Sequence, residues 1–400
     1  MNNTYNVEDR NCPVCNSNKK ELLFSQSFSG ITESNLLSSY EVVSCNECGF
    51  CFADKIPGQE RFDKYYRDLS KYESNTEEYK PSPYDLKRFG IMVPVIKEFL
   101  DEPDLHIVEV GCATGLLLSL IKKEGFNNIT GIDPSPGCTE TARKNYGIKV
   151  LTRTLSEIDL APDSVDFLIL VGVLEHVKDL DSSLEKLRNV LSENGKLYIA
   201  VPDASQYYKG EDAPFQEFSV EHINFFGPAS LSNLMKKNGF STVTVIQKMA
   251  EVNHRTITPV LQAVFSKNFQ IEAQSIFSPD VQTKDNLVTY IQICNDKEKA
   301  VKSAIEKVVD KEEPIIIWGT GAQTLRLLAN SKLGEAKIEA FVDSNPKYQG
   351  QSLNGIPIIS PTSVIDKKEP ILISTRPYQN EIEQQIREVL KLKNEVIKLY

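Results

Sequence analysis

Residues 106–115 read His-Ile-Val-Glu-Val-Gly-Cys-Ala-Thr-Gly, and this stretch decides the fold. Its first half is rich in β-branched residues around Glu109, which is typical of a buried strand. Gly111 and Gly115 frame the turn that follows, and residues 116–123 have the apolar spacing of an amphipathic helix. Because Gly111 has no Cβ, a ligand can lie against the backbone there. The stretch therefore predicts a strand, a glycine-rich turn and a helix that hold a cofactor.

Further strands are predicted downstream, and the next one ends in an acid. Residues 128–133 end at Asp133, whose carboxylate could accept both hydroxyls of a ribose. Asp is also common at turns and helix caps, so that role stays open as well. The sequence predicts two more strands, at residues 166–171 and 195–201. The segment Leu-Glu-His-Val at 174–177 follows the first of these two strands. The glycine spacing differs from the GxGxxG of dinucleotide-binding turns.

In this order, the motifs resemble those of class I S-adenosylmethionine (SAM) methyltransferases over about residues 105–247. The resemblance implies an α/β, Rossmann-like core with SAM as the cofactor. It places the methionine end of SAM against Glu109, Gly111, Ala113 and Gly115, the ribose against Asp133, and the adenine against Thr154 and Leu155. Many members have Gly where this chain has Ala113. His176 is expected to pack beneath the cofactor without reacting.

Composition narrows the function classes. The 400 residues include 40% hydrophobic residues, which allows two or three domains and a substantial core. The net charge of −10 argues against non-specific nucleic-acid binding, which depends on Lys and Arg. We find neither an apolar run long enough to cross a bilayer nor a signal sequence at the start of the chain. The expectation is a cytoplasmic protein that does not bind membranes.

The cysteines near the N-terminus have the spacing of metal ligands. Cys12-Pro-Val-Cys15 and Cys45-Asn-Glu-Cys48 are two CxxC knuckles with room for a hairpin between them. Disulfides are rare in a reducing compartment, and four thiolates complete a tetrahedral zinc shell. Because that shell leaves no position for water, we expect the zinc to be structural. Cys51 is interpreted as core packing.

The patterns predict five segments. They are a zinc-binding module (1–65), a tyrosine-rich connector and helix (66–100), the methyltransferase core (101–250), a helical and mixed linker (251–310) and a small Rossmann-like α/β domain (311–400). The last segment repeats the strand, glycine turn and helix at Gly319-Thr-Gly321, and a strand ends in Asp343. Thr324 replaces the third glycine of the dinucleotide fingerprint, so NAD binding is not favoured. That turn either holds a phosphate or serves only the architecture.

The whole chain resembles the three-part sugar C-methyltransferases, which methylate carbon 3 of nucleotide-linked 4-keto deoxysugars. The motifs that carry the resemblance are the two CxxC knuckles, the core, Glu221-His-Ile-Asn-Phe-Phe226, Gly319-Thr-Gly-Ala322 and Val342-Asp-Ser-Asn-Pro346. The resemblance implies a small-molecule partner, namely a nucleotide-linked sugar.

Carbon methylation needs a base beside a ketone. His222 is the candidate base, and Glu221 is the candidate that holds substrate hydroxyls or reaches the proton through water. The family has a tyrosine two residues before the Glu-His pair, where this chain has Ser219, and it draws another from the connector. Tyr79 is the chosen candidate for that phenol, with Tyr84 and Tyr207-Tyr208 as others. Lys87, Arg88 and Arg376 are candidates for meeting a substrate diphosphate.

Two other functions stay open. Ser219 makes an O- or N-methyltransferase acting on a sugar or related acceptor more attractive, since Ser is a far weaker acid than Tyr. The alternative from a different functional class is a non-catalytic protein that binds a nucleotide sugar and is stabilised by a structural zinc ion.

Overall fold

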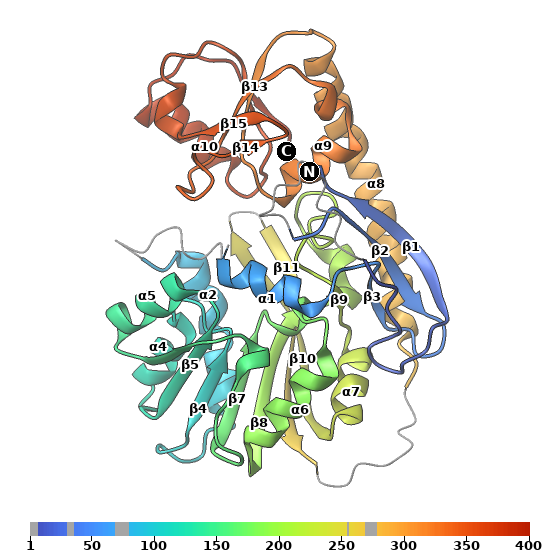
Figure 1. The fold of residues 1–400 in the computed structure, drawn as a ribbon, viewed down its shortest axis with the longest axis vertical. Coiled ribbons are helices and arrows are strands. Elements are labelled where there is room, and N and C mark those ends of the chain that lie inside the picture. Colours follow the sequence, from blue (N-terminus) through green and yellow to red (C-terminus); the bar gives the residue numbers. More distant parts are fainter. Residues whose placement is uncertain (1–6, 30–35, 69–79, 254–255, 269–277) are drawn as a thin grey trace.

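The computed structural model describes residues 7–29, 36–68, 80–253, 256–268 and 278–400. Its strands form three sheets, of four, seven and six strands. The seven-stranded sheet lies at one end of the long axis, the six-stranded sheet at the other, and the four-stranded sheet between them on one side (Figure 1). In the described parts of the chain, each helix is too short or too polar to span a membrane.

The seven-stranded sheet is the predicted core. Its order is β10-β11-β8-β7-β4-β5-β6. The strands are β4 (Ile107–Val110), β5 (Ile129–Asp133), β6 (Lys149–Thr152), β7 (Val165–Val171), β8 (Leu191–Pro202), β10 (Phe240–Asn253) and β11 (Thr256–Lys267). Strands β4 to β8 pair in parallel, and β10 and β11 are antiparallel additions. The strand order reverses beside β4, and ligands of such sheets bind where the order reverses.

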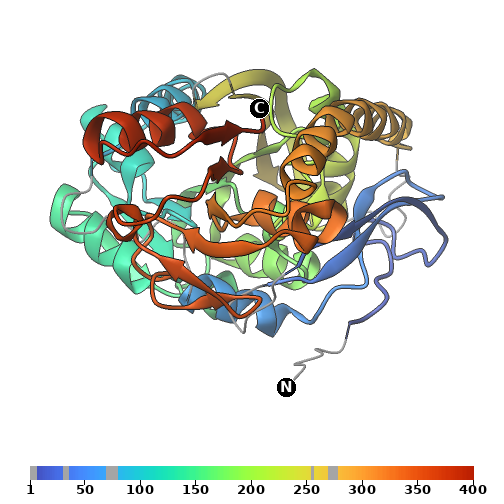
Figure 2. The ribbon, with the colours of Figure 1, turned by 90° about the horizontal axis from the view of Figure 1, so that it is seen from above.

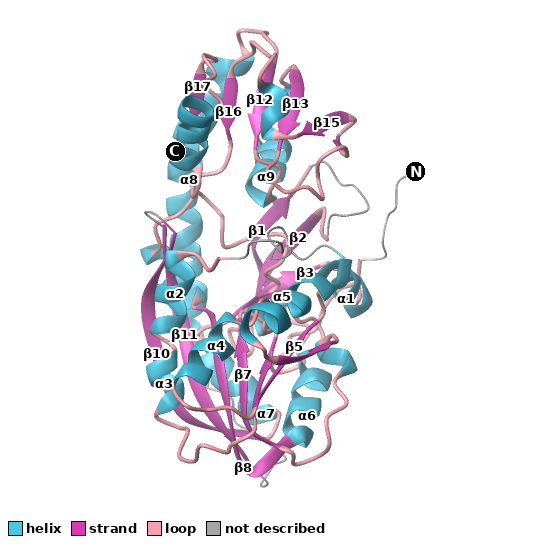
Figure 3. Ribbon diagram, turned by 90° about the vertical axis from the view of Figure 1, so that its left-hand side faces the viewer, coloured by secondary structure: helices cyan, strands magenta, loops and turns pink. Residues whose placement is uncertain are grey.

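Helices cover both faces of this sheet (Figure 3). They are α2 (Pro83–Gly90), α3 (Val93–Lys97), α4 (Leu116–Lys123), α5 (Pro136–Tyr146), α6 (Leu180–Val190) and α7 (Pro228–Lys237). Helix α4 has the predicted bounds, and Leu116, Leu117, Leu118 and Ile121 are buried. The helix expected within the 66–100 segment is instead two helices, α2 and α3, and Pro94 lies in the first turn of α3. Proline lacks the N–H that a continuous helix would need.

The four-stranded sheet joins the N-terminal module to the Glu221-His-Ile-Asn-Phe-Phe226 segment, which together with the turn before it, from Ser219, is called the acceptor-side motif. Its order is β1 (Lys20–Ser27), β2 (Ser39–Cys45), β3 (Cys51–Asp54) and β9 (Asn224–Phe225), all antiparallel. The hairpin expected between the two cysteine knuckles is β1 and β2. Strand β9 follows His222 directly, so pairing with β3 anchors the chain next to the candidate base. Helix α1 (Gln59–Asp68) then crosses over the core.

The six-stranded sheet forms the C-terminal module (Figure 2). Its order is β14 (Ser352–Leu353), β15 (Ile356–Ile359), β13 (Ile338–Val342), β12 (Ile315–Trp318), β16 (Ile371–Ile373) and β17 (Val396–Lys398), with α9 (Ala322–Asn330) and α10 (Gln379–Gln384). The segment expected as a linker over 251–310 contributes β11 to the core sheet and the long helix α8 (Val281–Val309). The core sheet therefore extends past residue 250.

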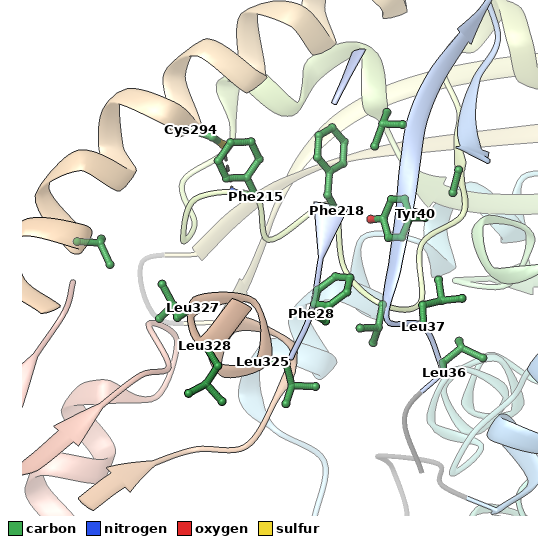
Figure 4. Packing of buried hydrophobic residues seen from close by; sticks show 14 of the residues in the cluster. Phe28, Leu36, Leu37, Tyr40, Phe215, Phe218, Cys294, Leu325, Leu327 and Leu328 are labelled. Carbon is green, nitrogen blue, oxygen red and sulfur yellow. Dashed lines mark hydrogen bonds between the residues drawn. The ribbon is translucent and has the colours of Figure 1, made fainter. Parts of the chain in front are cut away.

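One apolar cluster joins the three modules (Figure 4). It contains Phe28 and Tyr40 of the N-terminal module, Phe215 and Phe218 of the core, Cys294 of α8, and Leu325, Leu327 and Leu328 of α9. The Phe215 backbone N–H donates to Cys294 Sγ at 3.2 Å. Burying this surface at about 25 cal/mol per Å² favours one fixed arrangement of the modules.

Candidate active site

A cavity of about 1150 Å³ lies between the carboxyl edge of the core sheet and the glycine turn of the C-terminal module. The cavity is lined from the core by Glu109–Thr114, Asp133, Thr154–Ser156, Glu175–Val177 and Glu217, and by Ser219–His222 from the acceptor-side motif. Trp318–Thr324 and Asp343–Asn345 line it from the C-terminal module, and Tyr65 and Tyr66 from α1. A cofactor and an acceptor both fit in a space of this size.

The first glycine turn is held in left-handed conformations by its packing. Gly111 has φ +76°, and a Cβ there would lie 2.6 Å from Val173 Cγ2. Gly115 has φ +79°, and a Cβ would lie 2.9 Å from that of Ala142. Ala113 has φ +45°, a region that glycine adopts more easily than alanine. Gly111 and Ala113 line the cavity, and Gly115 lies against Ala142 beside it.

Two buried acids stand beside this turn. Asp133 Oδ2 accepts the Ala113 N–H at 2.8 Å, and Oδ1 accepts the Ser135 N–H at 2.9 Å. Burial raises the pKa of Asp133 to about 6 and, with the nearby Asp133 charge, raises that of Glu109 to about 8. Asp133 therefore does form the turn that sequence reasoning kept open, and it also faces the cavity.

These acids fit SAM. Oε2 of Glu109 is buried and has no hydrogen-bond partner among the described residues, so a cationic ligand group has an acceptor there. Thr154 is the N-cap of the short helix Leu155–Glu157, where its side chain and that of Glu157 form a capping box. This cap brings Thr154 and Leu155 to the cavity wall on the side of Asp133.

The acceptor side gathers two histidines and two acids. The rings of His176 and His222 lie 5.1 Å apart between their centroids. His176 Nδ1 lies 2.9 Å from the Glu221 carbonyl oxygen, a distance at which the ring N–H donates to it. Carboxylate and ring atoms of Glu175, His176 and His222 lie within 4.8 Å of one another. The fold thus brings His222 and Glu221 together with the Leu-Glu-His-Val segment at 174–177.

The phenols near this site come from α1. Tyr65 donates its hydroxyl to Glu221 Oε1 at 3.0 Å, and the Tyr66 ring lies 5.5 Å from that of His176, edge to face. The sequence did not single out either tyrosine as a site residue, because the position of α1 over the cavity depends on tertiary packing. Tyr79 lies outside the described residues, and Tyr84 and Tyr207 do not line the cavity.

Ser219 has a local role. Its Oγ accepts the backbone N–H of Glu221 at 3.2 Å and of His222 at 3.3 Å, and its carbonyl accepts the Tyr40 hydroxyl at 3.0 Å. The serine therefore shapes the turn that presents the Glu-His pair.

Two of the three candidate cations reach the cavity. Arg88 lines it and lies 3.6 Å from Asp85. Arg376 lines it from the C-terminal module and donates to the Glu211 carbonyl at 3.1 Å. Lys87 points away, because it pairs with Glu251 at 2.5 Å and does not line the cavity.

The C-terminal turn repeats the geometry of the first. Asp343 follows β13, as Asp133 ends β5, and it accepts the backbone N–H of Thr320 at 3.1 Å and of Asn345 at 2.8 Å. Gly319 has φ +110° and lies beside Ser374. Two similar turns, each with a carboxylate, therefore face one cavity.

The four knuckle cysteines come together away from this cavity. Cys12 and Cys48 have their Sγ atoms 3.5 Å apart, and those of Cys15 and Cys45 lie 3.4 Å apart. All four lie within 4.8 Å of one another, which fits a tetrahedral zinc shell with Zn–S distances of about 2.3 Å. Asn16 and Gly49 follow the knuckles with φ of 61° and 78°, left-handed conformations that both residue types tolerate.

Comparison with known proteins identifies the core. Residues 84–245 match the family described as "Methyltransferase domain", and residues 311–397 match "C2185-like, N-terminal". The mitochondrial ubiquinone biosynthesis O-methyltransferase of Bos taurus is 26% identical over 159 residues, which cover 36% of this chain and 43% of that protein. Its counterpart in Rickettsia conorii is 32% identical over 105 residues, 25% of this chain and 36% of that one. The chain thus spans less than half of either relative.

Solved structures resemble this chain over about half its length. A SAM-dependent methyltransferase of Thermotoga maritima, titled a possible histamine N-methyltransferase, has a TM-score of 0.37 at 22% identity and covers 52% of this chain and 98% of its own. The 1,6-didemethyltoxoflavin-N1-methyltransferase of Burkholderia thailandensis has a TM-score of 0.39 at 14% identity, and the match covers 56% of this chain and 96% of that one.

The family match, the curated relatives and the sheet order agree, and residues 84–245 are therefore a class I SAM-dependent methyltransferase domain.

Proposed function

We propose that this protein transfers a methyl group from SAM to a carbon of a nucleotide-linked keto deoxysugar in the cytoplasm. The observation that carries the proposal is the shared cavity, which runs from the first glycine turn past His222 to the second glycine turn. A cofactor at one end and a nucleotide at the other would place the sugar beside His222.

SAM would supply an electrophilic methyl group. Glu109 and the Gly111–Thr114 turn would hold its methionine end, Asp133 its ribose, and Thr154 and Leu155 its adenine. In the second turn, Asp343 and the backbone of residues 319–321 would hold the nucleotide of the acceptor. Arg376 would meet its diphosphate, since it is a cavity cation on that side.

His222 would act as the base. It would take the proton beside the acceptor's keto group, while Glu221 and Tyr65 hold neighbouring oxygens. His222 lines the cavity, its ring lies beside that of His176, and the His176 ring in turn contacts the Tyr66 ring. The Cys12, Cys15, Cys45 and Cys48 shell would hold a structural zinc, because four thiolates leave no open coordination position.

Methyl transfer to an oxygen is the second candidate, and two observations favour it. Ser219 stands where the sugar C-methyltransferases have a tyrosine, and its hydroxyl is engaged by backbone N–H groups. The bovine and Rickettsia relatives are named as O-methyltransferases.

A transfer assay with methyl-labelled SAM tests the proposal. The purified full chain is incubated with nucleotide-linked 4-keto deoxysugars and with matched sugars that carry a hydroxyl instead of the ketone. We expect label only in the keto acceptors, in a form stable to treatments that cleave methyl ethers. Label in the hydroxyl sugars would favour oxygen transfer, and no label in any acceptor would contradict an activity on these sugars.

A further inference from the structure

A second carboxylate stands behind the candidate base. Glu217 lies in the segment that leads to the Glu-His pair, and only 11% of its side chain is exposed. Its Oε2 lies 4.0 Å from His222 Nδ1. Nδ1 itself is enclosed, while the His222 side chain is 21% exposed and lines the cavity. One ring nitrogen of His222, Nδ1, therefore lies towards Glu217, and the residue itself forms part of the cavity wall.

The surroundings of Glu217 are acidic and apolar. Its backbone N–H donates to the Tyr290 hydroxyl at 3.3 Å, and Phe218 beside it is fully buried. Among the described residues, Glu175, His176 and Asp212 face the Glu217 and His222 pair, and Glu221 adjoins His222 in the sequence. Asp212 lies 3.8 Å from Arg376. Burial, with Asp212 and Glu175 nearby, raises the pKa of Glu217 to about 8.

We propose that Glu217 is the positioning residue of His222: it accepts the Nδ1 proton and thereby keeps Nε2 as the basic nitrogen. This inference rests on the proposed function. The present distance is about 1 Å longer than a hydrogen bond, and such contacts commonly shorten when substrate fills an active site. A carboxylate at this position selects the ring tautomer and stabilises the imidazolium, as in other carboxylate–histidine pairs.

In the proposed methyl transfer, each proton and each electron pair that moves has a donor and an acceptor. His222 Nε2 takes the proton from the carbon beside the ketone, and the C–H electron pair moves into the enolate. That pair then forms the new bond to the methyl carbon as the S–CH₃ bond of SAM breaks, which leaves S-adenosylhomocysteine. The imidazolium, held by ionised Glu217, afterwards returns its proton to water. No further reactant is needed.

Protonation sets the direction of the pH dependence. While Glu217 holds its proton it cannot accept from Nδ1, so the pair is assembled only as pH rises through about 8. Proton abstraction should therefore increase over that range and then level off.

The first test does not depend on the acceptor. Long-range proton–nitrogen NMR of histidine-labelled protein, with H222A for assignment, should show His222 protonated on Nδ1 at pH 9. In E217L, which has similar volume but no acceptor, the Nδ1-protonated form should lose its dominance, and E217D should restore part of it. An Nε2-protonated ring in the wild type, or the same tautomer in E217L, would overturn the proposal even if the enzyme has a different substrate.

The second test measures the base directly. In E217L, deuterium exchange and turnover should fall about 100-fold, within the range for acid–base catalysis. The rise near pH 8 should disappear, and SAM affinity and the melting temperature should stay near wild type. E211Q, an exposed neighbour, is the control. E217L/H222A should be no slower than H222A; a further loss of 100-fold, or a wild-type rate and pH profile in E217L, would contradict the proposal. Wild-type protein without exchange would instead count against carbon methylation, and the tautomer would still decide the role of Glu217.

Discussion

Tyr65 donates its hydroxyl to Glu221 Oε1 at 3.0 Å, and this bond links α1 to the acceptor-side motif. Burial and the nearby Glu221 charge raise the pKa of Tyr65 far above its ordinary value, so the phenol stays protonated and donates. The same helix binds the backbone of Lys178 and Asp179 through Gln59 and contacts Ser156 through Asp63. Helix α1 therefore connects the part of the cavity wall at Ser156 with the part at Glu221.

The first prediction concerns this bond. Tyr65→Phe keeps the ring and removes the donor, so Glu221 should be less well placed. A hydrogen bond to a charged group is worth about 1.5–3 kcal/mol, so kcat/KM for the acceptor should fall roughly 10- to 100-fold. SAM affinity, measured by calorimetry, should not change. Tyr84→Phe, outside the cavity, is the control, and unchanged acceptor kinetics in Tyr65→Phe would refute the role of this bond.

The second prediction concerns SAM binding and pH. Glu109 has a pKa of about 8 because of its burial and the nearby Asp133, with Arg88 opposing them. Its folded-state pKa lies above the unfolded value, so the free protein loses stability as pH rises towards 8. A cationic cofactor favours the ionised form, so binding at pH 7 should release close to one proton and tighten up to about pH 8.5.

Calorimetry in buffers of different ionisation enthalpy measures this proton release. Glu109→Gln should bind SAM more weakly and without pH dependence between 7 and 9, a range above the titration of Asp133, whose pKa is about 6. If the variant releases as many protons as the wild type, Glu109 is not the group responsible.

Sequence patterns predicted the local elements better than the contacts between distant segments. Helix α4 and the turn at Gly111 could be predicted, because the apolar spacing and the glycine that specify them lie within the same short stretch of sequence. The role of Gly111 was only partly predictable, since the collision with Val173 depends on a loop after another strand. The same holds for β11, whose place in the core sheet depends on pairing with β8, far away in the sequence.

The candidate catalytic residues show the same division. The Glu-His pair could be identified by motif, whereas Tyr65, Tyr66 and Glu217 lack a motif and are recognised by where the fold places them. Ser219 shows why a family pattern is not enough. Its hydroxyl accepts two backbone N–H groups of the turn, a role that does not need a tyrosine.

The third prediction concerns the metal shell. Cys45→Ser removes a thiolate, so the N-terminal module should lose zinc and melt at a lower temperature, because structural zinc contributes directly to folding. The loss should extend to α8, since the Asp280 N–H before this helix donates to the Cys48 carbonyl at 2.8 Å. Cys51→Ser, a buried cysteine outside the shell, should keep its zinc. Elemental analysis that finds one zinc per chain in Cys45→Ser would disprove the assignment.

The fourth prediction concerns the first glycine turn. Gly111→Ala forces a Cβ to within 2.6 Å of Val173 Cγ2 at φ +76°. The free energy of unfolding should fall by more than the roughly 1–2 kcal/mol that a left-handed alanine costs. Adding Val173→Ala removes the collision and should recover part of the loss, which denaturant unfolding of the two single variants and the double variant would measure. Strict additivity would show that the two positions do not interact.

The central claim is that His222 removes a proton from an acceptor carbon, and deuterium exchange tests it most directly. The full chain is incubated in heavy water with a nucleotide-linked 4-keto deoxysugar, first without SAM and then with S-adenosylhomocysteine to fill the cofactor end. The wild type should introduce deuterium at the carbon beside the ketone, and His222→Ala, with SAM affinity retained, should not. An acceptor that is methylated by the wild type but takes up no deuterium under either condition would contradict carbon methylation by His222.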